Sequence, residues 1–190
     1  YRIALYQDRE VFEAEADRIL REDVYPGWSG AVNALCRRVV PSGADVIVTG
    51  GDDVWPDPDR SAVEIGREFL ERFPDRFGVM QAEGSGYGLH RYCGSPWIGR
   101  AWADAMYGGR GALFEGYRHN WADNELFWVA LGMGALWRRD DLSQAHERFV
   151  GTGGEAPSYW RENAEGHDRA DLQLLVARAW SLFPGHEARG

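Results

Sequence analysis

The chain has 190 residues, of which 44% are hydrophobic and 13% aromatic, so we expect one globular domain spanning residues 1–190. Its net charge of −9 argues against a nucleic-acid backbone as the main partner, because that partner requires a basic surface. No run approaches the ~20 apolar residues of a membrane span, and the charged N-terminal stretch does not fit a signal peptide, so we expect a soluble, cytoplasmic protein.

Strand-like and helix-like segments alternate along the chain. We expect helices where apolar residues recur every three or four positions, as Phe12, Ile19 and Leu20 do, and strands where short β-branched runs lie between turn residues. Ser61 and Glu64 form the clearest helix start, a capping box. In chain order the expected elements are a strand at 1–7, helices at 10–22 and 31–40, a strand at 44–49, a helix at 62–73, a strand at 77–82, and helices at 123–133 and 168–182.

This order of elements predicts an α/β fold with a mainly parallel central sheet flanked by helices. We see no internal repeat, no low-complexity segment and no domain boundary. Tyr1 opens directly into a strand-like run, so the predicted fold leaves room for an N-terminal element upstream of it.

The chain contains no lysine and only two cysteines, and both facts exclude classes of chemistry. All 21 basic residues are arginine, which excludes a P-loop lysine, kinase-type phosphate binding and Schiff-base chemistry, since each needs a primary amine. The two cysteines, Cys36 and Cys93, lie far apart and form no CxxC pattern. We therefore expect neither a structural zinc site nor a disulfide framework.

The strand at 44–49 ends in two glycines followed by Asp52 and Asp53. In open α/β sheets ligands bind beyond the C-terminal ends of strands, and adjacent carboxylates need a cation or hydrogen-bond donors to offset their repulsion. Mg²⁺ and Mn²⁺ prefer such oxygen ligands and complete their shell with substrate phosphates. The same residues also suit an ordinary turn or a helix cap, so the local pattern leaves both interpretations open.

A second acidic pattern lies at the start of the helix at 123–133, in the segment Trp121-Ala122-Asp123-Asn124-Glu125. A carboxylate at this position is stabilised by the positive end of the helix dipole. Asp123 can therefore act as a general base, whereas the alternative is ordinary capping by Asp123 with Glu125 in the first turn.

Both patterns together resemble the inverting GT-A glycosyltransferases of family 2. Asn33 ends the segment Gly30-Ala31-Val32-Asn33, and residues 43–58 (GADVIVTGGDDVWPDP) are similar to the strand that carries the family's DXD metal motif. The chain departs from that motif in having Gly50 or Gly51 where relatives have the first acid. The resemblance implies a GT-A fold, with Asp52 and Asp53 holding Mn²⁺ or Mg²⁺ and with Asn33 and Asp52 contacting the nucleotide-sugar donor.

The same resemblance covers the helix start. Family members carry an E-D-x-E-L sequence whose Asp activates the acceptor, and residues 122–126 match it with Ala122 in place of the first Glu. The resemblance thus implies that Asp123 is the base, with Glu125 as the runner-up. It also implies a late histidine ligand for the metal, which we assign to His146, and a base-reading Asp at the end of the first strand, which we assign to Asp8.

Aromatic and histidine side chains suggest where the acceptor binds. Nine Trp residues are many for 190, and flat aromatic faces stack on the apolar faces of sugar rings. Trp97 and Trp121 are the best placed for this role, although most of the nine suit a core. His119 precedes Asp123 by four positions and is expected to orient it or to contact the acceptor.

The sequence therefore favours a metal-dependent glycosyltransferase of the hexosyltransferase class, using a UDP- or GDP-sugar donor and an unknown hydroxyl acceptor. A degenerate GT-A-like binding module without transfer activity is a second hypothesis, because both motifs lack an acid that the family carries. A metal-dependent phosphohydrolase or nucleotidyltransferase ranks last, since no second acidic cluster has the spacing of a two-metal site.

Overall fold

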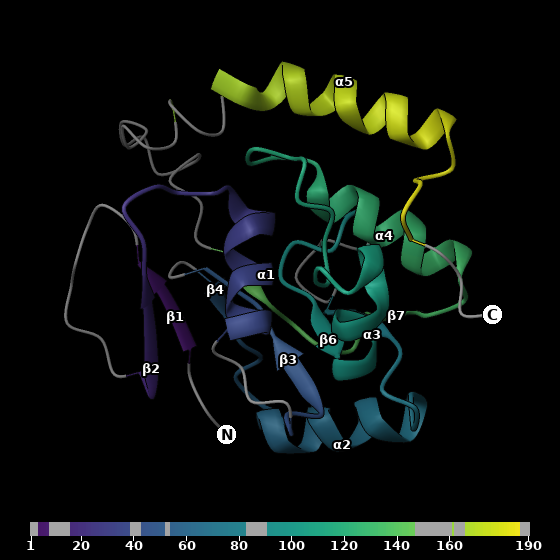
Figure 1. Cartoon of the computed structure of the whole chain (residues 1–190). Coiled ribbons are helices and arrows are strands. Elements are labelled where there is room, and N and C mark those ends of the chain that lie inside the picture. Colours follow the sequence, from purple (N-terminus) through teal and green to yellow (C-terminus); the bar gives the residue numbers. More distant parts are fainter. Residues whose placement is uncertain are drawn as a thin grey trace.

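A four-stranded mixed sheet organises the computed structural model, which describes residues 4–7, 16–38, 43–51, 54–82, 91–146, 161 and 166–186 (Figure 1). The strand order is β3-β6-β5-β7. The two pairings of β6 are antiparallel and the pairing of β5 with β7 is parallel. The strands are β3 (Val46–Val48), β5 (Val79–Ala82), β6 (Trp97–Gly99) and β7 (Leu136–Arg139).

The α/β class is confirmed, and the described sheet is mixed: β3, β5 and β7 run in one direction, whereas β6 runs against them. Only one of the three pairings in this sheet is parallel, because β6 lies between β3 and β5 and runs against both. Alternation of strands and helices along the sequence does not reveal such an insertion, since the pattern carries no information on strand direction. The GT-A fold itself stays a prediction.

Two strand pairs lie beside the main sheet. β1 (Ala4–Gln7) pairs in parallel with β2 (Arg18–Arg21), and β4 (Val54–Trp55) pairs antiparallel with β8 (Ala145–His146). The expected helix at 10–22 is therefore wrong in its last part. There Leu20 is buried in a small cluster with Ala34, so pairing and burial decide the conformation rather than the local apolar spacing.

Helices cover the two faces of the main sheet. The capping box is confirmed, since Ser61 accepts a hydrogen bond from the backbone of Glu64 and the Glu64 carboxylate accepts one from the Ser61 backbone. The helices are α1 (Trp28–Arg38), α2 (Ala62–Arg72), α3 (Arg100–Ala105), α4 (Ala122–Gly132) and α5 (Gly166–Trp180), with a short 3-10 helix at Met106–Gly108.

Alternating side chains of the strands separate two apolar clusters. Met80 packs with Ile65 and Phe69 of α2 on one face, whereas the adjacent Val79 lies with Leu126 of α4 on the other. The second cluster is the larger one and also takes in side chains of α1 and α3. The core therefore fills the layers on both sides of the sheet.

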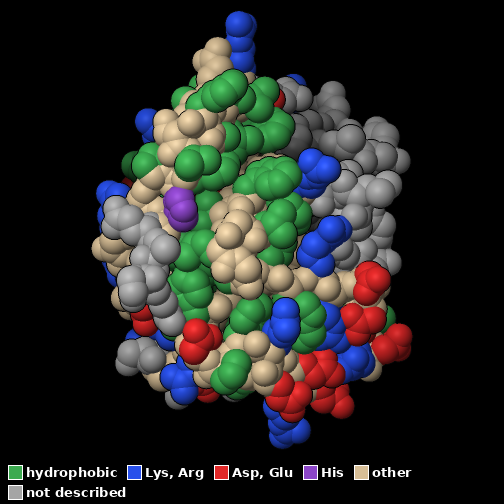
Figure 2. Space-filling model, turned by 90° about the vertical axis from the view of Figure 1, so that its right-hand side faces the viewer, with side chains coloured by type: hydrophobic (Ala, Val, Ile, Leu, Met, Phe, Trp, Pro, Cys, Tyr) green, Lys and Arg blue, Asp and Glu red, His purple; other side chains and the backbone are tan. Residues whose placement is uncertain are grey.

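The last helix, α5, lies outside this layered body and runs across α4 at the top of Figure 1. On the adjacent face of the molecule, hydrophobic side chains gather over the upper and central part and charged ones over the lower part (Figure 2). Among the described helices, none combines the length and the apolar character that crossing a membrane requires.

Candidate functional site

One edge of the main sheet holds the end of β3, the strand after which the sequence predicted a metal site. Val48, the last residue of β3, pairs with Trp97, the first residue of β6, and Ala82 at the end of β5 pairs with Arg139 at the end of β7. Thr49 continues β3 and donates two hydrogen bonds to the carbonyl of Pro96, from its backbone nitrogen at 3.1 Å and from its hydroxyl at 2.9 Å. The chain leaving β3 is thereby fixed at this edge.

The two predicted metal ligands Asp52 and Asp53 and the predicted nucleotide contact Asp8 lie outside the described residues. His146 belongs to β8, and its backbone pairs with Val54, the residue that follows Asp53 in the sequence. The backbone register therefore brings together two chain segments that the resemblance assigned to the metal. Within the part of the chain that the structure describes, no group of three His, Cys, Asp or Glu side chains could hold a metal ion.

Asp123, the predicted base, lies at the start of α4. A short turn joins the end of α4 to the start of β7, so the helix and the strand run in opposite directions. The start of α4 therefore lies toward the edge of the sheet where β7 ends. The backbone of Cys93 donates to the Asp123 carbonyl at 3.1 Å, and the Asn124 amide donates to the carbonyl of Arg91 at 3.0 Å. The Asp123 side chain accepts from the backbone of Asn124 at 2.9 Å and is partly exposed. Asp123 is thus less buried than Glu125, the other acid of this helix start.

Glu125, the runner-up for the base, is 1% exposed and has both carboxylate oxygens occupied. Oε1 accepts from the Tyr107 hydroxyl at 2.9 Å and from Arg178 at 2.6 Å, and Oε2 accepts from the Tyr117 hydroxyl and from Arg178, each at 2.7 Å. Burial and the charge of Glu125 raise the pKa of Tyr107 and Tyr117 well above the usual tyrosine range. The tyrosines thus stay protonated donors, and the Glu125 carboxylate has a structural role as the acceptor that links them to Arg178.

The segment before α4 carries the two predicted acceptor contacts. Trp121 adopts a left-handed backbone conformation, with φ of 71°, and its indole donates to Asp168 at 2.9 Å. The His119 backbone donates to Asp171 at 2.8 Å, and its ring nitrogen Nδ1 lies 3.4 Å from the Tyr25 hydroxyl. Both side chains are partly buried beside the start of α4, near Asp123 in the chain.

Trp97 and Asn33 are more deeply buried than their predicted roles require. Trp97 is 7% exposed and packs in the core beneath α2. The Asn33 side chain is fully buried, donates to the Leu113 carbonyl at 2.7 Å and accepts from the Leu113 backbone at 3.1 Å. These contacts give both residues a structural role, and their parts in sugar and donor binding stay predictions.

Comparison with known proteins leaves the family open. No family model matches this chain, and no curated protein or solved structure matches it significantly. The functional interpretation therefore rests on the motifs and on the geometry of this edge of the sheet.

Sequence reasoning missed the residues that fix the start of α4 from outside. Asp171 of α5 accepts three consecutive backbone N–H groups, from Arg118 at 3.0 Å, His119 at 2.8 Å and Asn120 at 3.0 Å. Asp168, one turn earlier, accepts from the side chains of Asn120 and Trp121. These acids lie 47 to 53 residues from their donors in the sequence, so no local sequence pattern predicts the contacts.

The burial of His119 makes a pH-dependent contribution to stability. Burial lowers the pKa of His119 below its ordinary value of 6.5 and outweighs the opposing effect of Asp171, while His167 adds to the lowering. As the pH falls through 6.5, the unfolded chain therefore takes up a proton that the folded protein takes up only at lower pH. The free energy of unfolding is therefore highest above this pH, where the ring is neutral in both states, and it falls as the pH drops below it.

We therefore expect the free energy of unfolding to fall between about pH 7 and about pH 5.5, a window above the range in which ordinary carboxylates titrate. Urea denaturation at several pH values measures this slope for the wild type and for His119→Asn. The variant should show a shallower slope, since it removes one of five histidines. Equal slopes would show that His119 does not titrate differently in the two states.

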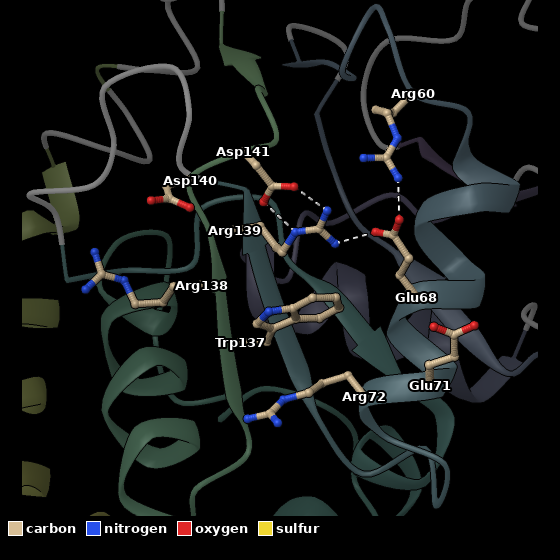
Figure 3. Close-up of a pocket in the computed structure, with 9 residues that line it drawn as sticks. All are labelled: Arg60, Glu68, Glu71, Arg72, Trp137, Arg138, Arg139, Asp140 and Asp141. Atoms are coloured by element: carbon tan, nitrogen blue, oxygen red, sulfur yellow. Dashed lines mark hydrogen bonds and ion pairs between the residues drawn. The ribbon is translucent and has the colours of Figure 1, made fainter.

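A shallow depression of about 640 Å³ lies on the α2 face of the sheet, opposite α4 (Figure 3). Arg139, at its centre, pairs with Asp141 at 2.6 Å and with Glu68 at 2.7 Å and lies over the Trp137 ring. Hydrogen bonds from Arg139 lower the pKa of both carboxyls. Four arginines face four acids across the lining, so the depression offers no excess of charge to an ionic ligand.

Proposed function

We propose that this chain is an inverting, metal-dependent glycosyltransferase that moves a sugar from a UDP- or GDP-sugar to an acceptor hydroxyl. The observation that supports the proposal is the pairing of Val54 with His146, because Val54 directly follows Asp52 and Asp53 in the sequence. Asp123, partly exposed at the start of α4, supplies the carboxylate that the transfer needs near the same edge of the sheet.

The proposed ligand set suits its metal. Carboxylate oxygens of Asp52 and Asp53 with an imidazole nitrogen of His146 form a mixed donor set that fits Mn²⁺ better than Mg²⁺, which prefers oxygen ligands alone. When bound, the ion stabilises the negative charge of the departing nucleoside diphosphate. Asp8 and Asn33 remain the proposed further contacts of the donor.

The chemistry assigned to the protein is a single displacement. The acceptor oxygen bonds to the anomeric carbon as the bond from that carbon to the diphosphate breaks, and an Asp123 oxygen takes the acceptor proton. No covalent sugar–enzyme intermediate forms, so the configuration inverts. His119 and Trp121 stand before Asp123 in the chain, where acceptor contacts are needed, and Trp97 is the less accessible candidate.

Calorimetry with UDP and GDP, each with and without Mn²⁺, tests the donor site. We expect one nucleoside diphosphate to bind in a manner that requires Mn²⁺, and we expect Asp52→Asn and Asp53→Asn each to weaken that binding 10–100-fold, since both remove an ionised ligand. Asp59→Asn is the matched control, because it makes the same change at an exposed position of the following turn. Metal-independent binding, or equal losses in all three variants, would contradict the proposed metal site.

The degenerate binding module is the second candidate, and one observation favours it. Glu125 matches the family motif, yet both of its oxygens are occupied by protein donors, so Asp123 is left as the one acid of this helix start for chemistry. Mn²⁺-dependent binding of a nucleoside diphosphate without transfer or donor hydrolysis would support this candidate over the enzyme.

A further inference from the structure

The helix α5 turns its charged side chains toward the protein. Its buried residues are Asp171 and Arg178, which are 2% and 8% exposed. Asp171 accepts the three backbone N–H groups of residues 118–120, and Arg178 bonds to Glu125 and to the Pro184 carbonyl. The Arg178 guanidinium also lies 3.4 Å from the centre of the Phe114 ring. α5 is therefore attached through polar and ionic contacts.

The opposite side of α5 is apolar and faces outward. Leu172, Val176 and Trp180 recur at intervals of four residues and are 38%, 47% and 85% exposed, and Leu182 just beyond the helix is 78% exposed. Arg169 is the one charged residue among the exposed positions of this fully described helix. Its exposed residues are Gly166, Arg169, Ala170, Leu172, Gln173, Val176, Ala177, Ala179 and Trp180.

The inward bonds fix which side of α5 is displayed. A rotation about the helix axis that buried Val176 would break the hydrogen bonds of Asp171 and leave the buried Glu125 without Arg178, which is costly. The helix therefore presents its apolar stripe to the outside. Figure 2 shows hydrophobic side chains gathered over the upper part of the molecule, where Figure 1 shows α5.

We propose that this stripe, Leu172, Val176, Trp180 and Leu182, is a self-association surface that packs against the same stripe of a second copy of this chain. Rows of residues four apart form the ridges of a helix, and a two-fold axis lets the ridge of one copy enter the groove of the other. Beside the ridge, the row of Gln173 and Ala177 forms a low groove, because Ala177 is small. A two-fold axis near Val176 sets Leu172 of one copy against Trp180 of the other.

Charge favours a second copy over a lipid surface. Two copies that each carry a net charge of −9 repel one another except where the contact surface lacks acidic groups, and no exposed residue of α5 is acidic. Helices that lie on membranes instead carry many basic residues on the polar face, whereas α5 uses Arg178 to bind Glu125 and exposes Arg169 alone.

The area is sufficient for a specific contact. An aromatic side chain offers roughly 150–250 Å². Trp180 is 85% exposed, and the three partly exposed aliphatic side chains together add about as much again, so the stripe exposes on the order of 500 Å². Two copies would bury on the order of 1,000 Å², the lower limit of stable interfaces. We therefore expect a reversible dimer with a Kd on the order of 10⁻⁵ M.

Sedimentation velocity over a range of concentrations tests the proposal with a matched pair of variants. Val176→Glu should weaken dimer formation at least tenfold, since it sets two carboxylates against each other at the axis. Val63→Glu is the control, because Val63 is 57% exposed on α2, at the far side of Figure 1 from α5, and it should leave dimer formation unchanged. Circular dichroism and thermal unfolding check that both variants fold as the wild type does.

Disulfide trapping gives a second measurement. Both native cysteines are buried, so Val176→Cys adds the accessible thiol, and under mild oxidation it should form a disulfide-linked dimer faster than Val63→Cys does. A wild type that stays monomeric at about 200 µM, or equal behaviour of the two glutamate variants, would overturn the proposal. So would wild-type binding to phosphatidylserine-containing vesicles that Val176→Glu abolishes, because the stripe would then be a lipid contact.

Discussion

Replacing Arg178 by methionine is expected to lower the free energy of unfolding by about 3–5 kcal/mol. The change leaves the Glu125 carboxylate buried without a counter-ion, and the hydroxyls of Tyr107 and Tyr117 do not neutralise its charge. It also removes the bond that α5 makes to the Pro184 carbonyl. Urea denaturation at neutral pH measures the loss, and Arg169→Met, on the exposed side of the same helix, should stay within about 0.5 kcal/mol of the wild type.

A double-mutant cycle separates the ion pair from simple packing. Glu125→Gln alone leaves the buried arginine without its partner, whereas the double variant with Arg178→Met removes both charges, so the double variant should be less destabilised than the two single losses added together. Additive losses would show that the two side chains do not depend on each other. A loss below about 1 kcal/mol for Arg178→Met would show that water already compensates Glu125.

Short sequence motifs correctly predicted those helices and strands whose conformation depends on neighbouring residues in the chain. The capping box at Ser61 starts α2, and the apolar run of residues 44–49 contains β3, because both signals lie within a few residues of the element that they specify. The strand at 18–21 escaped prediction because its conformation depends on pairing with β1, which no spacing within 10–22 reports. The reversed direction of β6 escaped prediction for the same reason.

The candidate site was predictable to a similar extent. The motif at residues 122–126 named Asp123 as the base and Glu125 as the runner-up, but it gave no information on the burial of either side chain. Only the fold shows that Glu125 is buried and Asp123 partly exposed. The partners that decide this are Tyr107, Tyr117 and Arg178, at separations of 18, 8 and 53 residues from Glu125. Glu125 is indeed an acid of the first turn, but its burial depends on these distant partners, which only the fold brings together.

Asp123→Asn is expected to reduce the transfer rate by about 10²–10⁴-fold, the range that a positioned general base contributes. The amide keeps the shape of the side chain, and its oxygen can still accept from the Asn124 backbone, so the fold should be retained. Mn²⁺-dependent binding of the nucleoside diphosphate should also be unchanged, because the base contacts the acceptor. The assay follows release of the nucleoside diphosphate from UDP- and GDP-sugars with pooled hydroxyl acceptors.

Comparison with Glu125→Gln makes the assignment of the base decisive. If Asp123 is the base, Asp123→Asn loses rate and keeps stability, whereas Glu125→Gln loses stability and, at temperatures where it is folded, keeps a rate within a few-fold of the wild type. The reverse pattern would move the base to Glu125 despite its burial. Rates equal to the wild type for both Asp123→Asn and Glu125→Gln would remove the base from this helix start altogether. The two acids lie two residues apart in the same helix turn, so each variant serves as the control for the other.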